Sequence, residues 1–176
     1  YGGTHDPFMG GTITGCPPNI PIDFSEIQKE MALRAPSDHF TSTKRKEPDQ
    51  VQFLSGIENG ITNGEPIHFN IPNTDVQPNP ETATILKPSH ASFTYQQKYG
   101  ITDNSGIGRA SARQTACRVV GGAIARQVLR QYHIEIKASI DPETEKILQK
   151  IQADPDFNDT IGAKVNGIIT NLPAGL

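Results

Sequence analysis

The 176-residue chain has little of several residue types, and each shortage bears on the class of protein. It has no tryptophan and two lone cysteines, Cys16 and Cys117, which fits a reducing compartment. The cysteines and the five histidines never fall at the spacing of metal ligands. No apolar run approaches the 18 residues of a membrane-spanning helix, and no secretory leader pattern is visible. We therefore predict a cytoplasmic protein without a metal site.

Charge of either sign is also sparse. Sixteen basic and nineteen acidic residues give a net charge of −3, which argues against a general nucleic-acid-binding protein. An anion site must then come from local clusters, which are residues 44–46 and the arginines at 109, 113 and 118. A hydrophobic content of 35% is low but allows one core, so a single domain over residues 1–176 is expected.

Hydrophobic periodicity predicts alternating strands and helices. Asp23 and Glu26 resemble a capping box at the start of a helix, and Asp141 with Pro142 marks the start of another. The order of elements predicts an α+β fold with helices packed on antiparallel sheet. The expected elements are a strand at 11–14, a helix at 23–33, strands at 51–55 and 67–71, a short helix at 95–99, a long helix from 111, a half-buried strand at 134–140, a helix from 141 and a strand at 163–169.

A glycine-rich turn leads into the longest helical pattern, at residues 100–116. The first turn of a helix has free N–H groups and the positive end of the helix dipole. Arg109 and Arg113, four residues apart, can face one anion there. The alternative is an ordinary turn and core helix with solvated arginines. A dinucleotide-binding fingerprint is not favoured, because no good strand precedes the glycines.

This stretch resembles the signature of a known family. The stretch Gly106-Ile-Gly-Arg-Ala-Ser-Ala-Arg-Gln-Thr-Ala116 resembles the Gly-Gly-Gly-Arg-Ser-Ser-Ala-Arg-Glu-Thr-Ala signature of chorismate synthases. The similarity extends over nearly the whole chain, including residues 45–51, 54–56, 87–95 and 98–100. The resemblance implies a β-α-β sandwich, with helices packed between antiparallel sheets, of which this chain holds an incomplete part.

The resemblance also implies a reaction. Chorismate synthases are lyases of aromatic amino acid biosynthesis, the shikimate pathway, and convert 5-enolpyruvylshikimate 3-phosphate to chorismate and phosphate by anti 1,4-elimination. They are flavoproteins that need reduced FMN, and the active enzyme is a homotetramer. The implied partner is thus a small-molecule substrate, with no nucleic acid and no membrane. In the family an aspartate from the C-terminal half serves as a base, so we expect this chain to be an N-terminal portion that is inactive alone.

The resemblance also implies site residues, through their positions in the family motifs. His5 and His90 are expected to be catalytic acids, Arg34 and Arg113 to bind substrate, and the run Arg109, Ala110 and Ser111 to bind FMN. The motifs differ from the family pattern: Gly2-Gly-Thr-His-Asp6 replaces Gly-Glu-Ser-His-Gly, and near His90 the family's arginine, glycine and aspartate are replaced by Lys87, Ser89 and Ser92. The alternative function is therefore a non-catalytic relative that binds flavin or a phosphate ligand, or an assembly subunit.

Overall fold

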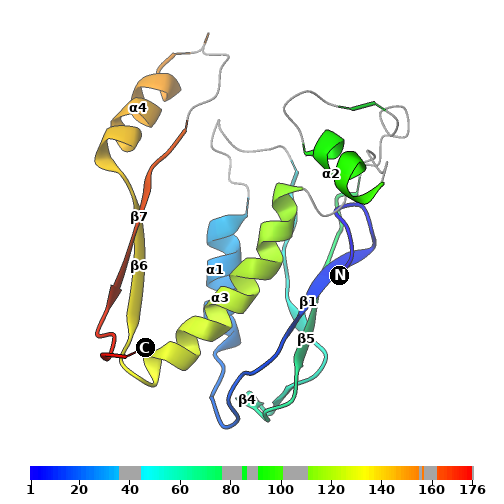
Figure 1. Ribbon diagram of the computed structural model, residues 1–176, viewed down its shortest axis with the longest axis vertical. Coiled ribbons are helices and arrows are strands. Elements are labelled where there is room, and N and C mark those ends of the chain that lie inside the picture. Colours follow the sequence, from blue (N-terminus) through cyan, green and yellow to red (C-terminus); the bar gives the residue numbers. More distant parts are fainter. Residues whose placement is uncertain are drawn as a thin grey trace.

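The computed structural model describes residues 1–35, 45–76, 85–86, 91–100, 111–154, 156 and 162–175. The predicted mixture of helices and antiparallel sheets is confirmed (Figure 1). No helix within the described ranges is both long and apolar enough to cross a membrane. The elements are β1 (Phe8–Ile13), α1 (Phe24–Arg34), β2 (Gln52–Phe53), β3 (Ile57–Glu58), β4 (Ile61–Thr62), β5 (Ile67–Pro72), α2 (Ser92–Tyr99), the 3₁₀ turn η3 (Ala112–Gln114), α3 (Thr115–Arg130), β6 (Glu135–Ile140), α4 (Pro142–Gln152) and β7 (Val165–Thr170).

The main sheet is antiparallel, in the order β1-β5-β2, with β5 in its centre. Alternate β5 residues, Ile67, Phe69 and Ile71, are buried, as the period-two pattern predicts for a sheet with one covered face. His68 points to the other face, where its Nδ1 lies 2.8 Å from the hydroxyl of Thr12. Solvent therefore lies on one side of this sheet and the core on the other.

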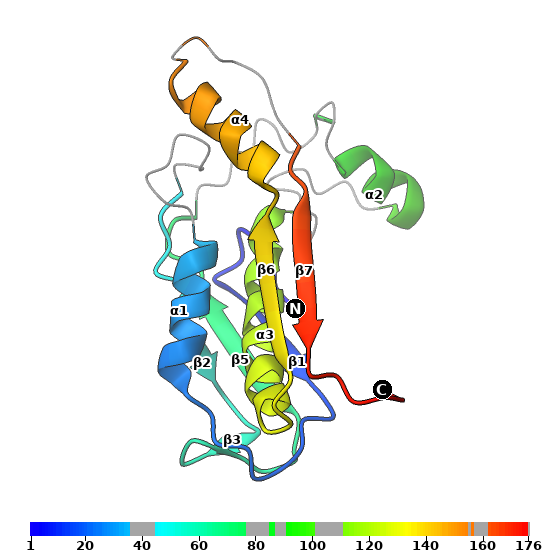
Figure 2. The same ribbon diagram turned by 90° about the vertical axis from the view of Figure 1, so that its left-hand side faces the viewer.

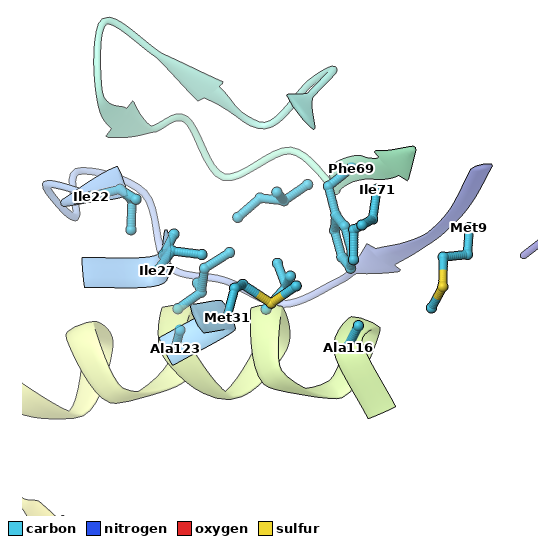
Figure 3. Close-up of a cluster of buried hydrophobic side chains, with 11 residues drawn as sticks. Met9, Ile22, Ile27, Met31, Phe69, Ile71, Ala116 and Ala123 are labelled. Atoms are coloured by element: carbon cyan, nitrogen blue, oxygen red, sulfur yellow. The ribbon is translucent and has the colours of Figure 1, made fainter. Parts of the chain in front are cut away.

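Two antiparallel helices, α1 and α3, cover the buried face of the sheet (Figures 1 and 2). The Asp23 carboxylate caps α1 by accepting from the N–H groups of Ser25 and Glu26. The second half of the predicted capping box is wrong, because Glu26 instead pairs with Arg130 of α3. The core between helices and sheet is one cluster, drawn in Figure 3: Met9, Ile22, Ile27, Met31, Ile67, Phe69, Ile71, Ala116, Val120, Ala123 and Ile124.

A second antiparallel ribbon, β6 with β7, lies on the opposite side of the helix pair from the main sheet (Figure 1). The predicted strand is present, but the prediction that it is half-buried is wrong, since every β6 residue is exposed. The register places Ile136 beside Ile169 and Ile140 beside Val165, on one face of the ribbon. These four side chains are 40 to 64% exposed, so the described residues cover this apolar face of the ribbon only in part.

Candidate functional site: a buried ionic cluster

The ends of several elements meet at one end of the helix pair. Arg34 is the last residue of α1, Arg113 lies in η3 just before α3, and Asn73 follows β5. An extended segment, residues 45–51, passes between them. Because α1 and α3 run antiparallel, the C-terminal end of one lies beside the N-terminal end of the other, which brings the two arginines together (Figure 1).

Asp49 joins the two arginines. Its Oδ1 accepts a hydrogen bond from Arg113 Nη1 at 2.7 Å, and its Oδ2 accepts from Arg34 Nη2. The Asp49 side chain is 1% exposed, and that of Arg113 is 6% exposed. Removing one member of a buried ion pair leaves the other charge unpaired and costs about 3 to 5 kcal/mol. Asp49 therefore fixes the positions of both guanidinium groups.

Glu47 forms the second carboxylate of the cluster. It accepts from Arg45 Nη2 at 2.7 Å, from the Thr74 amide at 2.8 Å and hydroxyl at 2.7 Å, and from the Asp75 amide at 3.1 Å. Burial alone would raise the pKa of Glu47, but hydrogen bonds from Thr74, Arg45 and Asp75 outweigh burial and lower the pKa to about 2. Glu47 is thus ionised at any pH at which the protein works.

The cluster has a residual positive charge. Three arginines, at 34, 45 and 113, face two carboxylates, those of Glu47 and Asp49, which leaves a net charge of +1 among these five side chains. Arg34 Nε is buried and has no hydrogen-bond partner among the described residues. A buried donor without a partner is unfavourable, and an anion would satisfy it. The arrangement is therefore suited to binding an anionic ligand.

The loop that carries His5 is attached to this cluster. Gly2 begins the loop at a φ of +75°, and a Cβ atom there would lie 2.4 Å from the Phe8 carbonyl oxygen, so only glycine fits. Arg45 Nη2 donates to the Thr4 carbonyl at 3.1 Å, and Asn73 Nδ2 donates to the Asp6 carbonyl at 2.7 Å. His5 itself is half-buried, with Nδ1 shielded from solvent.

The structure thus brings together two of the residues predicted for the site and attaches the loop that carries a third to the same cluster. Arg34 and Arg113 meet on Asp49, and the His5 loop is bound to the same cluster. Ser111 lies next to it at the start of η3, where its Oγ accepts from the Arg113 amide at 3.3 Å. The predicted residues His90, Arg109 and Ala110 lie outside the described residues. Within the described ranges, no group of three or more His, Cys, Asp or Glu side chains is placed to hold a metal ion.

Sequence reasoning assigned no role to three residues that organise the site: Glu47, Asp49 and Asn73. The first two lie in the basic stretch at 45–51 that carries part of the family resemblance. Their residue type could have identified them, because carboxylates next to several arginines in a buried segment must pair with those arginines. Asn73 gives no such signal, because its partners lie 40 to 70 residues away along the chain.

Comparisons with known proteins show which family the chain resembles. A family model described as chorismate synthase matches residues 1–176. The chorismate synthase of Nitratidesulfovibrio vulgaris (strain DSM 19637 / Miyazaki F) is 38% identical over 206 residues, covering 100% of this chain and 58% of that protein. That of Parabacteroides distasonis is 38% identical over 207 residues, with the same two coverages. A structure titled "Crystal Structure of Chorismate Synthase" superposes with a TM-score of 0.61 at 29% identity, covering 80% of this chain and 35% of that one. The chain thus spans somewhat more than half the length of the curated relatives it matches.

Proposed function

Because the chain belongs to the chorismate synthase family, we propose that the protein is a lyase of aromatic amino acid biosynthesis. Its substrate would be 5-enolpyruvylshikimate 3-phosphate, from which an anti 1,4-elimination of phosphate gives chorismate. The observation that carries this proposal is the meeting of Arg34, Arg113 and the His5 loop in one ionic cluster. The motif difference around His5 does not prevent that cluster from forming.

The charge of the cluster fits the proposed substrate, which has a phosphate and two carboxylates. Arg34 is the more available of the two arginines, because its Nε has no partner among the described residues. Arg113 directs Nε to Asn73, Nη1 to Asp49 and Nη2 to the Pro72 carbonyl, so most of its donors are already used. We propose that Arg34 binds the anion directly and that Arg113 adds charge and its remaining N–H groups.

In this proposal the proton donors are histidines. Imidazole has an ordinary pKa of about 6.5, so it can be a proton donor near neutral pH when an anion is bound beside it. His5 would protonate the leaving phosphate or lie toward the flavin, and His90 would take the other place. When bound, reduced FMN supplies electron density to the breaking carbon–oxygen bond. Arg109, Ala110 and Ser111 are the proposed FMN residues.

Ser111 fits a phosphorylated cofactor. Its Oγ accepts from the Arg113 amide, so its hydroxyl hydrogen is available to donate to a ligand. A neutral hydrogen bond contributes about 0.5 to 1.5 kcal/mol, so Ser111→Ala should weaken FMN binding by about 2- to 12-fold. Arg109→Ala should weaken it more. Thr115→Ala is the control, because this exposed hydroxyl donates to the Ala112 carbonyl in the same turn. A flavin titration that gives Ser111→Ala, Arg109→Ala and Thr115→Ala the same affinity as the parent contradicts this placement.

Phosphate release under anaerobic conditions, with reduced FMN and the full-length protein, tests the proposed activity. Arg34→Ala should lower kcat/KM by about 10- to 150-fold, the value of a charge-assisted hydrogen bond of about 1.5 to 3 kcal/mol. Arg126→Ala is the matched control, since Arg126 pairs with Glu30 across the same two helices away from the cluster. Equal effects of the two variants would contradict the anion site. Flavin binding without phosphate release would favour the non-catalytic alternative.

A further inference from the structure

The Asn73 side chain connects Arg113 to the loop that carries His5. Asn73 is buried, and its Oδ1 accepts from Arg113 Nε at 2.8 Å. Its Nδ2 donates to the carbonyls of Gly3 at 3.1 Å and Asp6 at 2.7 Å, on either side of His5. The orientation of the amide is determined by its partners, because a guanidinium only donates and a carbonyl only accepts. Both N–H donors of this side chain, and one of the two lone pairs of its oxygen, are thus used between the two groups.

Other members of the cluster bind the same loop. Gln114 Nε2 donates to the Gly2 carbonyl at 3.1 Å, and Arg45, which Glu47 holds, donates to the Thr4 carbonyl at 3.1 Å. The backbone N–H of Asn73 also donates to the Pro7 carbonyl at 3.0 Å. Side chains and backbone from three distant segments therefore determine the path of the loop, and Asn73 makes the largest share of these contacts.

We propose that Asn73 is a positioning residue that holds the His5 loop at a fixed distance from Arg113. The inference rests on the proposed function, in which His5 donates a proton near an anion bound at the arginines. A proton donor and the group it protonates must meet within hydrogen-bond distance, and a misplacement of about 1 Å can cost about 10²-fold in rate. The loop's own hydrogen bonds, from the Gly3 amide to Asp6 Oδ2 and from the Asp6 amide to the Gly3 carbonyl, shape its turn, and Asn73 fixes the position of that turn relative to Arg113.

Asn73→Asp separates the two contacts. The aspartate keeps an oxygen for Arg113 Nε but loses the N–H donors, so an oxygen faces the Gly3 and Asp6 carbonyls. Asn73→Ser removes both contacts without adding charge. Asn70→Asp is the matched control, because it makes the same chemical change on β5, where Asn70 Oδ1 accepts from the Tyr1 hydroxyl.

Two measurements on the full-length protein test whether Asn73 positions the His5 loop. Hydrogen exchange by mass spectrometry, without substrate or flavin, should show faster exchange at residues 2–7 in both Asn73 variants and no change in Asn70→Asp. Steady-state phosphate release with reduced FMN should show kcat about 10²-fold lower in both Asn73 variants. In Asn73→Asp KM should rise as well, because the added carboxylate cancels the net charge of +1 at the arginines. A merely structural role would lower the apparent kcat only in proportion to the folded fraction, which circular dichroism measures, and would leave KM unchanged.

Each outcome of these two measurements bears on a different part of the proposal. Unchanged exchange at residues 2–7 in both variants would overturn the proposed contact between Asn73 and the loop. Faster exchange with an unchanged kcat would overturn its role in positioning. A parent protein that releases no phosphate would overturn the proposed function and the catalytic consequence together, whereas the exchange result would still decide whether Asn73 holds the loop.

Discussion

At the scale of single residues, the protonation of Glu47 links the ionic cluster to pH. Its pKa of about 2 in the folded protein lies below the ordinary value of 4.5, so the unfolded chain binds a proton at higher pH than the folded chain does. The contribution of Glu47 to the free energy of unfolding is therefore complete above about pH 5. It is lost as the pH falls from about 4.5 to about 2.

Replacing Glu47 by glutamine tests this linkage. We expect Glu47→Gln to lower the free energy of unfolding at pH 7 by at most about 3 kcal/mol, the value that the lowered pKa implies. The loss should shrink toward zero at low pH, where the parent residue is also protonated. Urea unfolding followed by circular dichroism at several pH values measures it, with the exposed Glu65→Gln as control. A loss that stays constant from pH 7 to pH 3 would show that Glu47 acts by packing and not by charge.

At this scale, the sequence alone identified some residues of the site and missed others. His5, Arg34 and Arg113 were found through their place in family motifs, and the structure brings two of them onto one carboxylate. Asn73 was not found, because its importance comes from partners that folding brings together and not from any local pattern. A charged or catalytic residue type draws attention in a sequence, whereas a buried amide does not.

At the scale of elements, strands with similar patterns differ in burial. Ile71 of β5 is fully buried, and Ile169 of β7 is 55% exposed. We expect Ile71→Ala to lower the free energy of unfolding by about 2 to 5 kcal/mol, through lost burial and a residual cavity. Ile169→Ala, the matched control on the ribbon, should change it by less than about 0.5 kcal/mol. Urea unfolding of the two variants measures both values. A large loss in Ile169→Ala would mean that the apolar face of the ribbon is covered in solution.

This contrast marks where prediction from sequence succeeded and failed. The long helix was predicted because Ala116, Val120, Ala123 and Ile124 recur at helical spacing, and they form its buried face. The strand at β6 was predicted from alternation, but its burial was not predicted correctly. Alternation shows which residues share a face of a strand, and it carries no information about what lies against that face.

At the scale of the whole molecule, the helix pair lies between the main sheet and the ribbon and is linked along its length. Gln127 exchanges two hydrogen bonds with the Asp23 backbone, and Arg130 and Arg126 pair with Glu26 and Glu30. The pair therefore has polar links from the start of α1 to the ionic cluster. The α+β arrangement was predicted from the order of elements, because short connections and antiparallel strands leave few ways to pack them.

The contact between Gln114 and the Gly2 carbonyl has a further consequence, for the order of events during synthesis. It spans 112 residues, and ribosomes add about 5 to 20 residues per second, so the His5 loop must wait about 6 to 22 s for this partner to be made. In that interval β1 and α1 exist without α3, and the apolar side chains of Met9, Ile27 and Met31 lack the helix that covers them. The site is thus completed only after α3 has been made, and until then these apolar side chains are exposed surface of the kind that favours aggregation.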